Sequence, residues 1–276
     1  MHTCIDTRFG KLAVEITGSG PPFVLLHSGG HDRHDFDAIV PSLARRYRTV
    51  AIDLLGHGDS AHLEPPSSMS TAKISVTVED VLRALQLPPA IVLGNSVGGL
   101  AALYLASAQP ARVRGLVLVS PSGMVEQTAI VRAFCWAQGR VWVRRHFGMA
   151  FARHYLVKRS THADALLARM AVRRRDERFL QMEAGLWRSF GTPESDLSAL
   201  TPSIRCPTLF VWGRHDPVIR ANIEGARARR LLPHAQWIDM DAGHVPFVET
   251  PEAFLTAIEP FIASHVAPAS ARSALA

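Results

Sequence analysis

One serine lies in a stretch whose residue types suit nucleophilic chemistry. "GNSVG" runs from Gly94 to Gly98 with Ser96 at its centre, and it fits the G-x-S-x-G pattern. The glycines leave room for a strand and a helix to approach closely around a tight turn. Such a turn lifts the hydroxyl clear of a sheet and points free helix N–H groups at a reacting atom. The pattern predicts a nucleophile, and the alternative is a serine that only caps the helix.

A serine nucleophile needs a base, and the base needs a carboxylate to orient it. His244 follows the apolar run Ala235–Met240 in "DAGHVPF", and Asp216 follows the run Pro207–Gly213 in "WGRHDP". The chain order serine, aspartate, histidine is the order expected when the serine lies on a strand-to-helix turn. We therefore predict that Ser96, Asp216 and His244 form a catalytic group.

Other histidines and aspartates compete for these two roles. His215 adjoins the predicted aspartate, but neighbours in an extended loop point apart. Asp239 falls inside a predicted strand, and Asp241 is expected to form a turn. His27 and His57 are expected to bond loop backbone near the site. These positions are therefore weaker candidates than Asp216 and His244.

The predicted catalytic group requires strands that end at one edge of a sheet. Short continuous apolar runs alternate with helical patterns, which predicts an α/β protein with a mostly parallel central sheet flanked by helices. The expected strands are Lys11–Ile16 (antiparallel), Phe23–His27, Thr49–Asp53, Ala90–Gly94, Arg114–Ser120, Pro207–Gly213 and Ala235–Met240. The expected helices are Asp35–Arg45, Thr71–Leu85, Val97–Ala108, Asn222–Leu232 and Pro251–His265.

The alternation of strands and helices stops at Pro121 and resumes at Pro207. The interval has a helical pattern throughout, so residues 122–200 are predicted to form a helical insertion between two strands of one sheet. Residues 1–121 and 201–266 are then expected to form the main domain. The last ten residues, 267–276, are expected to form a flexible tail.

The positive net charge is concentrated in the predicted insertion. The chain carries a net charge of +6, and residues 122–200 hold 13 Lys and Arg against 7 Asp and Glu. Apolar residues at helical spacing separate these arginines, which favours amphipathic helices over a groove for nucleic acid. The dense run Arg173–Arg175 is expected to be a solvated helix face. No nucleic-acid partner is therefore predicted.

Several sequence signals point to a cytoplasmic protein without cofactors. The N-terminus has no secretory pattern, and no apolar run approaches the length of about 20 residues that spans a bilayer. The cysteines Cys4, Cys135 and Cys206 are scattered, which fits a reducing compartment. We find no metal-binding or phosphate-binding motif. We therefore expect no membrane partner, no metal and no cofactor, while the oligomeric state is not readable from sequence.

Taken together, these motifs resemble the α/β-hydrolase family from about Lys11 to about Phe261. "LLHSGG" (Leu25–Gly30) resembles the family's oxyanion loop, and "DLLGHGDS" (Asp53–Ser60) resembles the loop that follows the next strand. "GHVPFVETPEAF" resembles the catalytic-histidine loop and its following helix. The resemblance implies an α/β-hydrolase fold with a helical cap, residues 122–200, inserted after the sixth strand.

The resemblance also implies two backbone donors for an oxyanion. One is the N–H of Val97, directly after the nucleophile. The other comes from the loop after His27, where the family usually has glycine and this chain has Ser28. We favour the N–H of Gly29, with Ser28 as a side-chain contributor. The residues expected to shape the site around these donors are His27, Gly30 and Asn95.

Several reactions are compatible with this constellation. A serine on the strand-to-helix turn, the nucleophile elbow of this family, argues against haloalkane dehalogenases and epoxide hydrolases, because those relatives use a carboxylate nucleophile. Hydrolysis of a carboxylic ester of a small, mainly apolar substrate through an acyl-enzyme is favoured. The stretch "GNSVGG", with Asn95 before the serine, resembles the strand-to-helix turn of C–C hydrolases that act on meta-cleavage products. Those enzymes tend to have a tryptophan soon after the catalytic histidine, where this chain has "VPF". A third alternative is a ligand-binding member of the fold without turnover.

Overall fold

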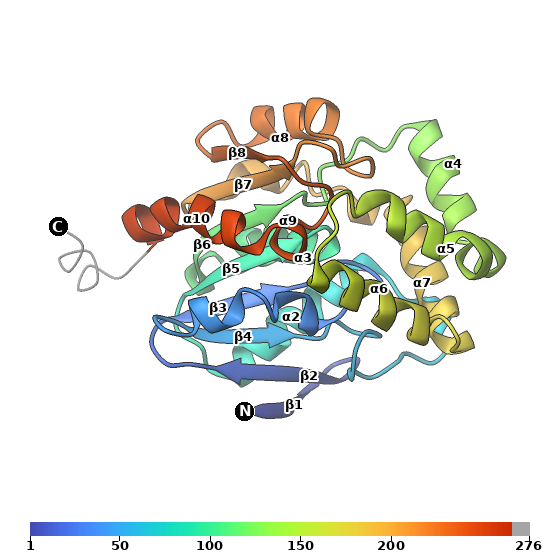
Figure 1. Ribbon diagram of the computed structural model, residues 1–276, viewed down its shortest axis with the longest axis horizontal. Coiled ribbons are helices and arrows are strands. Elements are labelled where there is room, and N and C mark those ends of the chain that lie inside the picture. Colours follow the sequence, from blue (N-terminus) through green and yellow to red (C-terminus); the bar gives the residue numbers. More distant parts are fainter. Residues whose placement is uncertain (267–276) are drawn as a thin grey trace.

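Eight strands form one sheet in the computed structural model, which describes residues 1–266 (Figure 1). They are β1 (His2–Thr7), β2 (Gly10–Thr17), β3 (Pro22–Leu26), β4 (Arg48–Ile52), β5 (Ala90–Asn95), β6 (Val113–Val119), β7 (Thr208–Gly213) and β8 (Gln236–Met240). Their order is β1-β2-β4-β3-β5-β6-β7-β8. The first two strands pair antiparallel, as do β2 and β4, and all other pairs are parallel. The predicted mostly parallel sheet is confirmed.

The sheet is covered on both faces because its central strands are apolar on both sides. In β3, Val24 and Leu26 belong to one apolar core, whereas Phe23 and Leu25 belong to the other. The helices α2 (Thr71–Ala84), α3 (Val97–Ala108) and α8 (Ala226–Leu231) contribute to the first core. The helices α1 (Val40–Leu43), α9 (Pro246–Glu249) and α10 (Pro251–Phe261) contribute to the second. The buried, uninterrupted apolar runs of the sequence are the consequence of this double cover.

Three expected helices differ from those observed. The expected helix at Asp35–Arg45 is a 3-10 turn, Arg33–Phe36, followed by α1, because Pro41 lacks an N–H and blocks a continuous helix. The expected helix at Asn222–Leu232 begins as a π turn, Ala221–Gly225, before α8. α10 ends at Phe261 and a π turn, Ile262–Val266, follows. The predicted tail, residues 267–276, lies outside the described residues.

Four helices connect β6 to β7 and lie together at one end of the sheet (Figure 1). They are α4 (Ala129–Gln138), α5 (Val141–Tyr155), α6 (Thr161–Arg173) and α7 (Glu177–Phe190). We call residues 122–200 the helical segment. Its two ends meet, because the N–H of Leu197 donates to the carbonyl of Gly123 over 2.7 Å. The insertion therefore follows the sixth strand, as expected.

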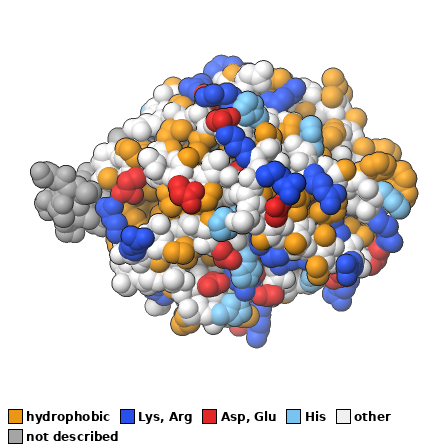
Figure 2. All heavy atoms as spheres, viewed as in Figure 1, with side chains coloured by type: hydrophobic (Ala, Val, Ile, Leu, Met, Phe, Trp, Pro, Cys, Tyr) orange, Lys and Arg blue, Asp and Glu red, His pale blue; other side chains and the backbone are white. Residues whose placement is uncertain are grey.

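Several large apolar side chains of the helical segment are exposed, and two of them, Ile130 and Phe134, lie at a cavity described below. The exposed large apolar side chains on α4 and α5 are Ile130, Phe134, Trp136, Trp142 and Phe147. Hydrophobic side chains are visible at this end of the molecule in Figure 2, with charged groups of both signs spread over the remaining face. Within residues 1–266, no helix combines the length and the apolar character needed to cross a bilayer.

Candidate active site

Ser96 lies on a sharp turn between β5 and α3. Its backbone has φ 52° and ψ −115°, a region that residues with a Cβ rarely adopt. A Cβ on Gly94 would lie 2.3 Å from the carbonyl oxygen of Gly98, and a Cβ on Gly98 would lie 2.3 Å from that of Leu26. Both glycines are therefore required by the close crossing of strand and helix. The Ser96 side chain makes no capping hydrogen bond and lines a cavity, so the capping alternative does not describe it.

His244 and Asp216 are paired beside the same cavity. His244 Nδ1 lies 2.7 Å from Asp216 Oδ2, and both side chains are almost completely buried. The other oxygen of Asp216 accepts hydrogen bonds from the N–H groups of Val218 and Ile219, which fixes the carboxylate. His244 lines the cavity together with Ser96. The structure thus brings together the three residues predicted as the catalytic group.

The competing residues pair elsewhere. His215 Nε2 lies 2.9 Å from Asp241 Oδ1 at the surface, and Asp241 also pairs with Lys158. Asp239 is half-exposed and faces Arg229. These contacts direct all three groups away from the cavity.

His27 orients the peptide that carries the predicted oxyanion donor. Its Nε2 accepts a hydrogen bond from the N–H of Leu54 over 3.0 Å, so the proton is on Nδ1, which donates to the carbonyl of Ser28 over 2.7 Å. Burial lowers the pKa of His27, which keeps the ring neutral. In a trans peptide the N–H points opposite to the C=O, so the N–H of Gly29 faces away from His27.

Gly29 and Val97 lie next to each other. A Cβ on Gly29 would lie 3.8 Å from Cγ1 of Val97, and Gly29 lines the cavity. Within residues 1–266, neither backbone N–H makes a hydrogen bond. By contrast, the N–H of Gly30 donates to His57 Nε2 over 2.9 Å. The two predicted donors are therefore available to a ligand, whereas the next N–H along the loop is occupied.

The Asn95 side chain connects the turn at Ser96 to two neighbouring segments by hydrogen bonds. Its amide nitrogen donates to the carbonyl of Val119 over 2.9 Å and to the carbonyl of His244 over 3.1 Å. The side chain therefore connects β5 with β6 and with the loop that carries the histidine. It acts on the backbone around the site and does not line the cavity.

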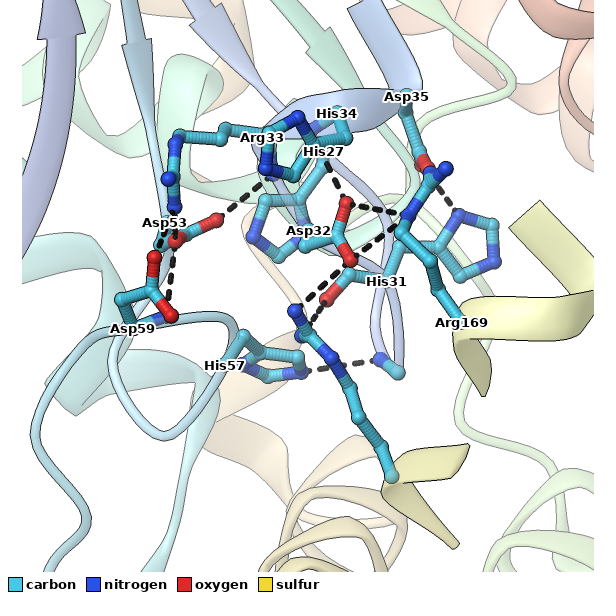
Figure 3. A network of polar contacts seen from close by, with 12 residues as sticks. His27, His31, Asp32, Arg33, His34, Asp35, Asp53, His57, Asp59 and Arg169 are labelled. Carbon is cyan, nitrogen blue, oxygen red and sulfur yellow. Dashed lines mark hydrogen bonds and ion pairs between the residues drawn. The ribbon is translucent and has the colours of Figure 1, made fainter. Parts of the chain in front are cut away.

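A buried polar network holds the loop that follows the oxyanion loop (Figure 3). Arg169 of α6 lies 3.0 Å from both Asp32 and Asp35. His31 Nδ1 lies 2.5 Å from Asp35, and its Nε2 lies 2.7 Å from the hydroxyl of Tyr155. These residues were missed by the sequence reasoning. The density of histidine and aspartate in "HDRHDFD" was the available signal.

Two arginines of the helical segment contradict the expected solvated face. Arg173 lies 2.8 Å from Asp32, and Arg174 lies 2.6 Å from Glu183 in a buried pair. Only Arg175 of this run is exposed. The expectation fails because Asp32 comes from a distant part of the chain and Glu183 from the next helix, whose packing against α6 local charge patterning cannot show.

The cavity between the sheet and the helical segment has a volume of about 320 Å³. Its floor is formed by Ser28, Gly29 and Ser96, with His244 at one side. Most of its wall is apolar. The wall residues from the helical segment include Val131, Phe134, Phe151, Leu186, Trp187 and Phe190.

Comparison with known proteins agrees with this architecture. A sequence model of the alpha/beta hydrolase fold family matches residues 21–251. A pimeloyl-[acyl-carrier protein] methyl ester esterase of Xanthomonas axonopodis pv. citri (strain 306) is 30% identical over 268 residues, which covers 91% of this chain and 98% of the relative.

Solved structures show the same fold. A hydrolase from Pseudomonas aeruginosa PA01 superposes with a TM-score of 0.81 at 25% identity, covering 95% of this chain and 98% of that one. A thermophilic esterase from Thermogutta terrifontis gives 0.80 at 23% identity, with the same coverage of both chains. The chain therefore belongs to the alpha/beta hydrolase fold family, as its elbow and its sheet predicted.

Proposed function

We propose that this protein hydrolyses carboxylic esters, with Ser96 as nucleophile, His244 as general base and Asp216 as the group that orients the histidine. One observation carries the proposal: a serine on a strained turn shares a cavity with a buried His–Asp pair 2.7 Å apart. Two backbone N–H groups without partners within residues 1–266 lie beside that serine. These features support acyl transfer through a serine.

The reaction would proceed in two steps. His244 takes the proton of Ser96 Oγ while that oxygen attacks the ester carbonyl carbon, and the negative charge on the carbonyl oxygen is received by the N–H groups of Gly29 and Val97. Collapse of this intermediate expels the alcohol, which takes the proton from His244. Water that gives a proton to His244 then attacks the acyl-enzyme, and the acid leaves as Ser96 regains its proton.

The helical segment would act as a cap over this chemistry. Residues 122–200 supply most of the apolar wall of the cavity, whereas residues 1–121 and 201–266 supply the proposed catalytic group. A wall of this kind excludes water and strengthens the electrostatic interactions inside the site. It favours a small, mainly apolar substrate.

The test is hydrolysis of p-nitrophenyl butyrate by the purified chain. We expect turnover that falls at least about 10³-fold in Ser96→Ala and is retained in Ser107→Ala, a matched change on α3 outside the cavity. An initial burst of about one equivalent with slow later release would support the acyl-enzyme. A wild-type protein with no serine-dependent turnover would overturn the proposal and leave C–C bond hydrolysis or ligand binding to be tested.

A further inference from the structure

Glu183 brings a carboxylate into the wall of the cavity. The residue lies on α7, is 3% exposed and lines the cavity. Its Oε1 accepts a hydrogen bond from Arg174 Nη2 over 2.6 Å. Its Oε2 is buried and has no hydrogen-bond partner within residues 1–266. A buried carboxylate oxygen without a donor costs several kcal/mol in general, so the oxygen is suited to a group that a ligand brings.

Glu183 lies directly over the loop that carries the proposed oxyanion donor. A Cβ on Gly30 would lie 2.7 Å from Glu183 Oε1, and a Cβ on Gly29 would lie 3.2 Å from Leu186 Cδ2. Glu183 and Leu186 are three residues apart, so they share one face of α7. The carboxylate is therefore one residue along the loop from the position of the ester carbonyl, within reach of a substituent a few bonds away.

The second carboxylate in the cavity wall is not available in the same way. Glu224 Oε2 accepts a hydrogen bond from the N–H of Arg220 over 2.7 Å. Gln127 also lines the cavity, and its buried amide oxygen has no hydrogen-bond partner within residues 1–266, while its nitrogen donates to the carbonyl of Phe190. The unpartnered oxygens of Glu183 and Gln127 are acceptors, so a hydrogen-bond donor on the ligand would satisfy them.

The surrounding charge decides which donor is suited to the site. Glu183 faces two guanidinium groups: Arg174, with which it pairs, and Arg144, which is 1% exposed. Arg144 has no carboxylate partner within residues 1–266 and lies against the rings of Phe151 and Trp187. Two positive charges against one negative charge repel an ammonium group. A neutral hydroxyl donates without adding charge.

We propose that Glu183 determines specificity by accepting a hydrogen bond from a neutral hydroxyl of the substrate, close to the ester carbonyl. Hydroxylated esters are then preferred over plain alkyl esters of the same size. This inference rests on the proposed ester hydrolysis. It concerns which esters the protein prefers, and it leaves the proposed roles of Ser96, His244 and Asp216 as they are.

The test compares three esters with the full chain, measured by titration of released acid. They are ethyl butyrate, ethyl 3-hydroxybutyrate with the hydroxyl on the acyl side, and 2-hydroxyethyl butyrate with the hydroxyl on the alcohol side. We expect kcat/KM for one hydroxylated ester to exceed that of ethyl butyrate by about tenfold or more. The hydroxylated ester that is preferred shows on which side of the carbonyl Glu183 acts.

Variants then link the preference to the carboxylate. Glu183→Leu is expected to bring the ratio of the two kcat/KM values to about one, and Glu183→Gln to lower it less, because an amide oxygen is a weaker acceptor. Glu177→Leu, on the exposed first turn of the same helix, is the control and should keep the wild-type ratio.

Two results would overturn the inference. One is a wild-type protein that prefers neither hydroxylated ester, a result that needs no variant to fold. The other is a preference that persists in Glu183→Leu. If the wild-type protein hydrolyses p-nitrophenyl butyrate, either of these two results refutes this inference alone. A protein that hydrolyses no ester refutes the proposed function and this inference together.

Discussion

The backbone of Ser96 stores strain that its neighbours must hold in place. With φ at 52°, a Cβ at this position costs on the order of 1–3 kcal/mol. We expect Ser96→Gly to raise the free energy of unfolding by about 1 kcal/mol relative to Ser96→Ala, since glycine adopts positive φ without that cost. Urea denaturation of the two variants measures the difference, and equal midpoints would show that the turn is unstrained.

The fully buried imidazole of His57 should make stability depend on pH. Burial lowers its pKa well below 6.5. Its Nδ1 donates a hydrogen bond to the carbonyl of Leu55, and its Nε2 accepts one from the N–H of Gly30. Below pH 6.5 the unfolded chain binds a proton that the folded chain does not, so the free energy of unfolding falls as pH falls. Above pH 6.5 both states are neutral and this contribution is constant.

We expect His57 to contribute up to about 1.4 kcal/mol per pH unit to this loss as the pH falls below 6.5. In His57→Gln the slope should decrease by that amount, although the variant is less stable at every pH because hydrogen bonds of the ring are lost. Urea denaturation at pH 7.5, 6 and 5 measures both slopes. Identical slopes would mean that another group binds the proton.

Single residues differ in how well the sequence predicts them. Ser96, Asp216 and His244 were predicted because each follows a predicted strand, and parallel strands end at one edge. Tyr155 was missed, because its partner His31 lies 124 residues away in the chain. The direction in which a helix of the insertion points its side chains is set by packing, which a single sequence does not specify.

The last turn of α5 connects two loops of the site. The carbonyl of Tyr155 accepts the N–H of His244 over 3.0 Å, and its ring lies 5.4 Å from the imidazole of His244. Its hydroxyl bonds His31 of the loop that follows the oxyanion loop. Tyr155 is thus a positioning residue that joins the proposed base to the loop of the proposed oxyanion donor.

Tyr155→Phe removes the hydroxyl that contacts His31 and keeps the ring and the backbone carbonyl that contact His244. His31 Nε2 loses its partner, so we expect the free energy of unfolding to fall by about 1–3 kcal/mol. We also expect kcat for p-nitrophenyl butyrate to fall by about tenfold with little change in KM. Tyr104→Phe on α3 is the control, and a loss that appears in KM alone would contradict the positioning role.

The length and burial of an element decide how well the sequence predicts it. The central strands are short apolar runs closed by polar loops, and they were predicted within about one residue. The edge strand β1 was missed because its residues alternate between exposed and half-buried. The helix around α1 was predicted too long, because the apolar residues on both sides of Pro41 keep helical spacing. The proline nevertheless prevents one continuous helix there.

The helical segment and the sheet are packed as one body. One apolar core joins Met182 and Leu186 of α7 to strand residues, and the other joins Leu166 and Met170 of α6 to the opposite face. We expect one cooperative thermal transition, with equal calorimetric and van't Hoff enthalpies. Differential scanning calorimetry measures both. Two resolved transitions would show that the helical segment unfolds by itself.

The meeting of the two ends of the helical segment bears on how such proteins diversify. The N–H of Ser122 donates to the carbonyl of Ser96, and the N–H of Leu197 donates to the carbonyl of Gly123. The chain leaves and re-enters the sheet through one narrow neck whose bonds are made by backbone alone. Side chains on the outer faces of α4 and α5 can therefore differ between members of the family while these backbone bonds, which fix the turn at Ser96, stay the same.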